Sequence, residues 1–313
     1  MDTFFKIGCH VSIAGGVWNA PKNAYDLGCE TFQIFTRSPQ GGPAPKLDEE
    51  ALEKFREQMK EYSYDLFVVH CPYFVNFGSS NPRVFYGSAS VVKQELERSS
   101  LLGVRYAMTH LGSARELGQE KAFAQTKKGL TKVLEEYEGS TQFLLEIAAG
   151  AGEVIGDTFE ELAELMEPLV KFKTFGGICF DTQHAFSSGY DLRTAEVLEE
   201  TFTKFDKAIG LKWLKMSHIN DSKVDLGSRK DRHDHIGEGK IGEEGFEAML
   251  TYLSKHKKTL IPQPPLPSAK RVSKQGEGES NKVAFGSMPL IFETEHDKVK
   301  ADIAILKKLR NKV

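Results

Sequence analysis

The sequence of 313 residues contains few cysteines, and their positions argue against two kinds of framework. Cys9, Cys29, Cys71 and Cys179 show no C-x-x-C spacing, so neither a thiolate zinc site nor a small disulfide scaffold is indicated. Two of the four fall inside apolar runs, where small buried thiols are common. We therefore expect a protein of a reducing compartment without a disulfide framework.

Long hydrophobic stretches and a strong excess of one charge are also missing. No segment reaches the roughly 18 consecutive apolar residues of a membrane-spanning helix, and the amino terminus, MDTFFK, does not begin like a secretion signal. The 41 basic and 44 acidic residues give a net charge of −3. We expect a cytoplasmic protein (viral or nucleoid-associated cytosol included) with no membrane partner, although a local basic surface could still bind nucleic acid.

Strand and helix patterns alternate along the whole chain. Alternation of this kind implies parallel strands joined by right-handed crossovers, and eight units favour a closed (β/α)8 TIM barrel over an open doubly wound sheet. We predict one such α/β domain spanning residues 1–313. The predicted strands lie near 5–12, 31–37, 66–73, 106–113, 142–149, 175–183, 211–220 and 288–295, and the predicted helices at 17–27, 48–62, 83–102, 119–137, 158–171, 192–208, 243–256 and 297–311.

Two segments interrupt the alternation. Residues 38–46, SPQGGPAPK, are rich in proline and glycine and predict a surface loop over the barrel mouth. Residues 262–287 lack apolar periodicity and are rich in Pro, Lys, Ser and Gly, which predicts a flexible insertion within the barrel domain.

Residue types that bind metals close most of the predicted strands. Strand-end histidines and carboxylates are the way a parallel barrel builds a metal-centred site. Each one alone has an ordinary explanation, such as a structural hydrogen bond, a salt bridge across the barrel mouth, a helix N-cap or a solvated charged loop. The candidate ligands are His70, His110, Glu146, Asp181, His184, His218, Asp231, His233 and Glu293.

Taken together, these five histidines and four carboxylates exceed the needs of one metal ion. The number suggests a cluster of two or three metals, and mixed imidazole and oxygen ligands suit Zn²⁺, Mn²⁺ or Fe. Neighbouring metals that clamp the attacking and leaving oxygens are used for phosphodiester hydrolysis. Basic residues around the last ligands, Arg229, Lys230, Arg232 and Lys240, would suit a phosphate backbone.

Five ordered motifs carry a resemblance to a known family. They are IGCHVSIAGG at 7–16, DTQHAF at 181–186, GYDLRT at 189–194, HINDSK at 218–223 and GSRKDRH at 227–233. The chain resembles endonuclease IV, the metal-dependent apurinic/apyrimidinic endonucleases of base excision repair. The resemblance implies a (β/α)8 barrel that cleaves duplex DNA 5′ to abasic sites, leaving a 3′-hydroxyl and a 5′-deoxyribose phosphate. It also implies a monomer with no obligate protein partner.

The same resemblance implies a grouping of the ligands around three divalent metals. The expected ions are Zn²⁺, with Mn²⁺ or Fe at one or more sites. A metal-bound hydroxide would be the nucleophile, and Glu146 would act as the bridging ligand of the catalytic centre. The implied groups are His70, His110 and Glu146; Glu146, Asp181, His218 and Glu293; and His184, Asp231 and His233.

The resemblance further implies contacts with DNA. Tyr73 looks like the family's aromatic residue that enters the duplex near the lesion, with Phe74 beside it, whereas ordinary packing at the barrel rim is the alternative for both rings. Gln40 stands where the family usually inserts an arginine, with Arg37 slightly earlier. Ile147 replaces a frequent asparagine after the bridging glutamate. The full set of expected contacts is Arg37, Gln40, Tyr73, Phe74, Arg229, Lys230 and Arg232.

Two other functions compete with the endonuclease hypothesis. A sugar isomerase or epimerase on the same barrel would use fewer metal ligands, with a lysine or paired glutamates as acid and base. A nucleic-acid-binding protein with a structural or decayed metal site would bind the lesion without turnover.

Overall fold

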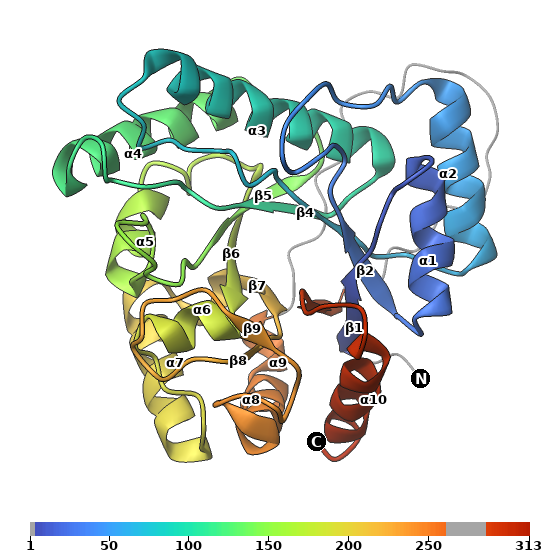
Figure 1. Cartoon of the computed structure of the whole chain (residues 1–313), viewed down its shortest axis with the longest axis vertical. Helices are drawn as coiled ribbons and strands as arrows, with labels where there is room; N and C mark the ends of the chain where they lie inside the picture. The colour runs from blue at the N-terminus through green and yellow to red at the C-terminus, as the bar shows by residue number, and fades with distance from the viewer. Residues whose placement is uncertain (1–3, 261–285) are drawn as a thin grey trace.

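Eight parallel strands close into a barrel, which confirms the (β/α)8 prediction (Figure 1). In the computed structural model, which describes residues 4–260 and 286–313, the hydrogen-bonded order is β1-β10-β7-β6-β5-β4-β3-β2. Barrel strands that follow one another along the chain are therefore neighbours in space. These strands are β1 (Phe5–His10), β2 (Thr31–Ile34), β3 (Val68–His70), β4 (Tyr106–Thr109), β5 (Gln142–Glu146), β6 (Phe175–Asp181), β7 (Leu214–His218) and β10 (Met288–Phe292).

The helices surround the barrel and begin close to the predicted positions. Asp48 and Thr158 cap two of them, each accepting a hydrogen bond from a backbone N–H in the first turn. Gly103 ends another with a φ of 80°, the left-handed conformation that glycine adopts without strain. The predicted helices are η1 (Val17–Asn19) with α1 (Ala20–Asp26), α2 (Glu49–Glu61), α3 (Pro82–Leu102), α4 (Gln119–Glu135), α5 (Phe159–Met166), α7 (Ala195–Ala208), α8 (Gly242–Lys255) and α10 (Val299–Arg310).

Several short elements were not predicted. They are α6 (Thr182–Ser187), η2 (Leu211–Trp213), α9 (Lys257–Leu260) and the antiparallel pair β8 (Asp221–Ser222) and β9 (His233–Asp234). The predicted insertion at 262–287 falls almost wholly outside the described residues. Within residues 4–260 and 286–313, no helix combines the length and the apolar character needed to cross a bilayer.

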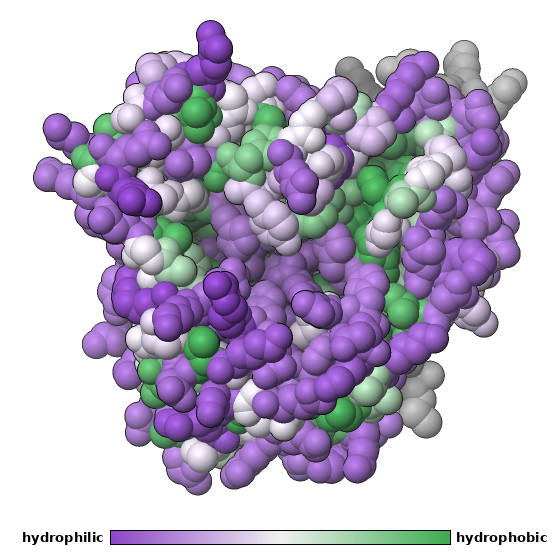
Figure 2. Space-filling view, viewed as in Figure 1, coloured by the Kyte–Doolittle hydropathy of each residue, from purple (hydrophilic) through white to green (hydrophobic). Residues whose placement is uncertain are grey.

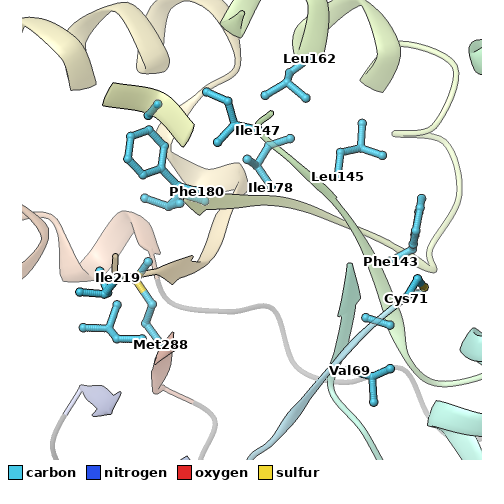
Figure 3. Packing of buried hydrophobic residues seen from close by; sticks show 14 of the residues in the cluster. Val69, Cys71, Phe143, Leu145, Ile147, Leu162, Ile178, Phe180, Ile219 and Met288 are labelled. Carbon is cyan, nitrogen blue, oxygen red and sulfur yellow. The ribbon is translucent and has the colours of Figure 1, made fainter. Parts of the chain in front are cut away.

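The two faces of each barrel strand pack in different layers. Outward side chains such as Val69, Leu145 and Phe180 join the large hydrophobic cluster between the barrel and the helices (Figure 3). Inward side chains form a second, separate cluster along the barrel axis. That inner cluster consists of Val68, Tyr106, Met108, Leu144, Cys179, Met216 and Ile291. The barrel is therefore filled with side chains and is closed below its mouth.

Candidate metal centre

Strand periodicity places six of the nine candidate ligands at the barrel mouth. Side chains alternate between the two faces of a strand, so a residue two positions after an inward apolar residue also points inward. Because the strands are parallel, their carboxyl ends meet at one end of the barrel. The six pairs of inner residue and following ligand are Val68 and His70, Met108 and His110, Leu144 and Glu146, Cys179 and Asp181, Met216 and His218, and Ile291 and Glu293.

Glu146 lies at the centre of this arrangement and has no exposed surface. Its Oε2 is 3.1 Å from His70 Nε2 and 3.8 Å from His110 Nδ1, while its Oε1 is 2.8 Å from His218 Nδ1. His218 Nδ1 is also 3.2 Å from Glu293 Oε2. One carboxylate thus faces imidazoles from three other strands, and each of its oxygens belongs to a different group of neighbours.

Asp181 performs two tasks because a helix begins directly after β6. Its Oδ1 accepts a hydrogen bond of 2.8 Å from the backbone N–H of His184 and so caps α6, while its Oδ2 accepts one of 2.7 Å from Asn220 Nδ2. The cap also turns the His184 ring into the site. A helix cap and a candidate ligand pair, which were alternatives at the sequence level, therefore occur together.

The β8–β9 hairpin brings in the last two candidates from an exposed loop. Asp231 Oδ2 is 3.5 Å from His184 Nε2, and Asp231 Oδ1 is 3.4 Å from His233 Nε2. Asp221, which is fully buried, accepts hydrogen bonds from the backbone N–H groups of Gly237 and Ile241 and so fixes the following turn. The extended backbone between Asp231 and His233 lets both side chains reach the site.

The donor set fits divalent cations. The described residues contain groups whose ligand atoms all lie within 4.8 Å of one another: His70, His110 and Glu146; Asp181, His184 and His233; and Glu146, Asp181, His218 and Glu293. The Nε2 atoms of His184 and His233 are buried and have no hydrogen-bond partner. The other nitrogen of His184 lies 2.9 Å from the Ile147 carbonyl, and that of His70 lies 2.6 Å from the Cys71 carbonyl. Donation to a carbonyl leaves the second ring nitrogen free as a ligand.

Electrostatics in the site also favour cations. Burial lowers the pKa of His184, but Asp181 and Asp231 outweigh it and raise that pKa to about 10. Burial raises the pKa of Glu146, yet the imidazoles of His110 and His218 hold it well below its usual value. The pKa of His110 falls to about 4, chiefly because burial disfavours its charged form. Glu146 is therefore ionised at neutral pH and stabilises positive charge placed beside it.

One cysteine also reaches this region, although the cysteine spacing in the sequence indicated no thiolate zinc site. The Cys179 sulfur lies within 4.8 Å of ligand atoms of Glu146 and His218. Burial raises the pKa of Cys179 to about 12, so the thiol stays protonated at neutral pH. Cys179 belongs to the inner cluster along the barrel axis and forms part of the floor of the site.

Gln33 is a functional candidate that sequence reasoning missed. This fully buried amide on β2 lies between three side chains: its Nε2 donates to Glu293 Oε1 at 2.7 Å and lies 3.2 Å from His10 Nδ1, while its Oε1 accepts from His218 Nε2 at 2.8 Å. These contacts fix the His218 tautomer and turn its Nδ1 toward the carboxylates. A polar residue at an inward strand position next to the mouth was the available signal.

We expect Gln33→Met to weaken the binding of divalent metals about 10- to 100-fold, the usual cost of losing a partner that orients a ligand. Methionine keeps the length of the side chain but neither donates to Glu293 nor accepts from His218. Competition with a chromophoric chelator would measure the affinity. Gln125→Met, which removes hydrogen bonds from α4 to the Phe77 and Ser79 carbonyls, is the matched control. Equal affinity in Gln33→Met and wild type would contradict the orienting role.

The predicted DNA contacts divide into rim residues and one buried residue. Tyr73 is 57% exposed and Phe74 is 40% exposed, and the Tyr73 ring lies 5.6 Å from His70 and 6.1 Å from His110, centroid to centroid. The remaining exposed residues are Gln40, Arg229, Lys230 and Arg232, of which Arg229 pairs with Asp157 at 2.5 Å.

Arg37 does not suit direct contact with DNA, and its prediction requires correction. The residue is 6% exposed, and its Nε lies 2.5 Å from Glu95 Oε1 while its Nη2 donates to Gln94 Oε1 at 3.1 Å. The guanidinium therefore anchors the loop after β2 to α3. Sequence reasoning could not foresee this because Glu95 lies 58 residues away.

Known proteins resemble this chain over most of its length. The family model described as xylose isomerase-like TIM barrel matches residues 21–255. A protein of Nitrosopumilus maritimus (strain SCM1) named probable endonuclease 4 is 40% identical over 263 residues, which is 83% of this chain and 94% of that protein. A protein of the same name from Methanoculleus marisnigri (strain ATCC 35101 / DSM 1498 / JR1) is also 40% identical, over 83% of this chain and 92% of its own length.

Solved structures show the same fold. The endonuclease IV of Thermus thermophilus superposes with a TM-score of 0.77 at 28% identity, covering 98% of this chain and 100% of that one. A D-tagatose 3-epimerase-like protein superposes with a TM-score of 0.69 at 19% identity, over 98% and 99% of the two chains. At that identity the likeness concerns the barrel alone.

Proposed function

The chain belongs to the endonuclease 4 family of xylose isomerase-like TIM barrels, and from this premise we propose that it hydrolyses the phosphodiester bond 5′ to abasic sites in duplex DNA. The products would be a 3′-hydroxyl and a 5′-deoxyribose phosphate. The observation that carries the proposal is the convergence of five imidazoles and four carboxylates at one barrel mouth, two of the imidazoles with a buried nitrogen that has no hydrogen-bond partner. A site of this size suits a cluster of cations better than a single ion.

In this proposal the nine side chains hold three divalent cations, with Zn²⁺ favoured and Mn²⁺ or Fe able to occupy one or more sites. When bound, such cations supply an activated water for attack on phosphorus and compensate the charge of the phosphate and the leaving oxygen. Glu146 belongs to the group with His70 and His110 and also to the group with Asp181, His218 and Glu293. It would therefore fix the positions of these two groups relative to each other. Asp231 lies 3.5 Å and 3.4 Å from His184 and His233 and completes the third group.

The protein surface around the mouth has the residues needed to hold a duplex. Arg229, Lys230 and Arg232 are exposed on the loop that also supplies Asp231, so they can bind phosphates next to the cleaved bond. Hydrophilic residues surround a hollow between the α3–α4 side and the α7–α8 side of the molecule (Figure 2). Tyr73 stands at the rim above His70 and His110, where it can fill the gap in the stack left by a missing base.

We expect Tyr73→Ala to reduce the preference for abasic over intact duplex about tenfold or more, since aromatic stacking on a base contributes about 1–3 kcal/mol. The metal content should not change, because the Tyr73 ring lies above the imidazoles without hydrogen bonding to the carboxylates. Fluorescence anisotropy with the two duplexes would measure the preference. Tyr86→Ala removes an exposed tyrosine from α3 and serves as the control. Equal lesion affinity in Tyr73→Ala and wild type would rule out the wedge role.

The direct test of the function is a gel assay with metal-loaded protein on a duplex containing one tetrahydrofuran abasic analogue, with and without chelator. Chelator-sensitive cleavage 5′ to the analogue, with about three metals per chain by elemental analysis, supports the proposal. Epimerisation of a ketose by a protein that leaves this DNA intact would instead favour a sugar epimerase. Tight binding of the lesion without cleavage at full metal occupancy would favour a binding protein.

A further inference from the structure

Two of the four free cysteines lie in contact on the outer side of the barrel, away from the metal centre. Cys9 on β1 is buried, Cys29 in the turn between α1 and β2 is half-buried, and their Sγ atoms are 3.5 Å apart. Both pack against the hydrophobic layer between the strands and the helices. The two residues are 20 positions apart, so sequence spacing gave no reason to pair them.

The surroundings activate one member of this pair. The contact with the Cys9 thiol lowers the pKa of Cys29 and burial opposes this, while the positive charge of Lys307 lowers the pKa further and the negative charge of Glu30 raises it. Lys307 is held nearby because its Nζ donates to the Gly28 carbonyl at 2.8 Å. The pKa of Cys9 is raised by the same contact with Cys29 and by burial. Of the two cysteines, Cys29 is therefore the more accessible one and the one that forms the thiolate. Cys9 is the second thiol, which stays protonated beside it.

We propose that Cys9 and Cys29 form a peroxide-reactive dithiol that closes to a reversible disulfide. The Cys29 thiolate attacks one oxygen of hydrogen peroxide, an S–O bond forms as the O–O bond breaks, and the departing hydroxide takes up a proton to become water. The Cys9 sulfur then attacks the Cys29 sulfenic acid, the S–S bond forms, and the hydroxyl leaves as water with the proton of Cys9. The two sulfurs lose two electrons, and peroxide is reduced to two waters.

The local backbone can accommodate this closure. The sulfurs must approach from 3.5 Å to about 2 Å, the length of a disulfide bond. Gly28, directly before Cys29, has a φ of 79°, and a Cβ added there would meet no atom within 4 Å, so this side of the turn has open space. The remaining cysteines lack these features: Cys71 and Cys179 are fully buried, and burial raises the pKa of both thiols.

The disulfide would close a ring of chain that includes the loop after β1. Val11 and Ile13 of that loop, together with Trp18 of η1, line a cavity of about 760 Å³ next to His10 at the barrel mouth. A crosslink between β1 and the turn before β2 restricts the unfolded chain, so the oxidised protein should have a Tm several degrees above that of the reduced protein.

The test treats the full-length, metal-loaded protein with hydrogen peroxide, quenches it with N-ethylmaleimide under denaturing conditions, and counts alkylated thiols by mass spectrometry. We expect the count to fall from four to two, with a linked peptide containing Cys9 and Cys29, and to return to four after dithiothreitol. Four alkylated thiols after peroxide treatment, or oxidation centred on Cys71 or Cys179, would overturn the proposal.

Three variants separate the roles of the sulfurs. Cys29→Ser should remove the reaction, whereas Cys71→Ala, which deletes a buried thiol elsewhere, should still form the linked peptide. In Cys9→Ser, which keeps a hydrogen-bonding side chain but cannot form the disulfide, the reaction should stop at a Cys29 sulfenic acid that dimedone captures. Failure of dimedone to label Cys29 in Cys9→Ser would contradict its assignment as the nucleophile. None of these readouts depends on DNA cleavage, so the proposal is tested independently of the proposed function.

Discussion

Replacing Glu146 by glutamine is expected to lower kcat for cleavage at an abasic analogue by at least about 10³-fold, or about 4 kcal/mol of transition-state stabilisation. Glutamine has nearly the same shape, but it removes one negative charge and turns N–H groups toward partners that need an acceptor. Glu146 contacts His70 at 3.1 Å and His218 at 2.8 Å and belongs to two of the candidate metal groups. Its loss therefore disturbs both groups together.

The barrel should stay folded in Glu146→Gln, because the change also removes a buried charge whose desolvation is costly. Single-turnover gel assays would measure the rate, and circular dichroism with elemental analysis would report the fold and the metal content. Glu164→Gln makes the same chemical change on the surface of α5, where the carboxylate lies 3.3 Å from Lys127, and should leave the rate unchanged. Turnover like that of wild type in a fully metallated Glu146→Gln protein would disprove the bridging assignment.

Removal of metal is expected to abolish cleavage and to lower the Tm on the order of 10 °C. A ligand present at a thousandfold its Kd stabilises the native state by about 4 kcal/mol, and each kcal/mol moves the Tm of a large domain by about 2–4 °C. The carboxylates of Glu146, Asp181 and Glu293 converge on the same site, so cations there remove repulsion that the metal-free fold retains. Differential scanning calorimetry with and without chelator would measure the shift.

Re-addition of Zn²⁺ to the chelated protein should restore both the Tm and the cleavage, which separates metal loss from irreversible damage. Mg²⁺ at the same concentration is the matched comparison, since it prefers oxygen ligands in octahedral geometry and is poorly held by imidazoles. Undiminished cleavage by protein shown to be metal-free would exclude the proposed chemistry.

Sequence periodicity predicted the barrel well because strand and helix signals are local. Each of the eight barrel strands falls within a predicted range, and the predicted ranges extend past the carboxyl ends of the strands into segments that include His110 and Glu293. The α6 helix was missed because DTQHAF is short and begins with a residue suited to both capping and metal binding. Propensity cannot separate these two roles when one side chain performs both.

Contacts between distant segments could not be predicted in the same way. Gln33 meets His218 and Glu293, which follow it by 185 and 260 residues, and Arg37 meets Glu95 on α3. These pairings depend on the register of neighbouring strands and on which helix covers which strand. The hydrophobic pattern along the chain specifies neither the strand register nor the helix that covers each strand.

The sequence alone determined the order of strands and helices, the residue types at the strand ends and, through five motifs, the family. Those features follow from local periodicity and from chemistry that each residue carries by itself. Only the tertiary structure decided which amide orients His218, which arginine is buried and which two sulfurs touch. Closure of the barrel brings residues together that are far apart in the chain, so these facts arise from packing and register.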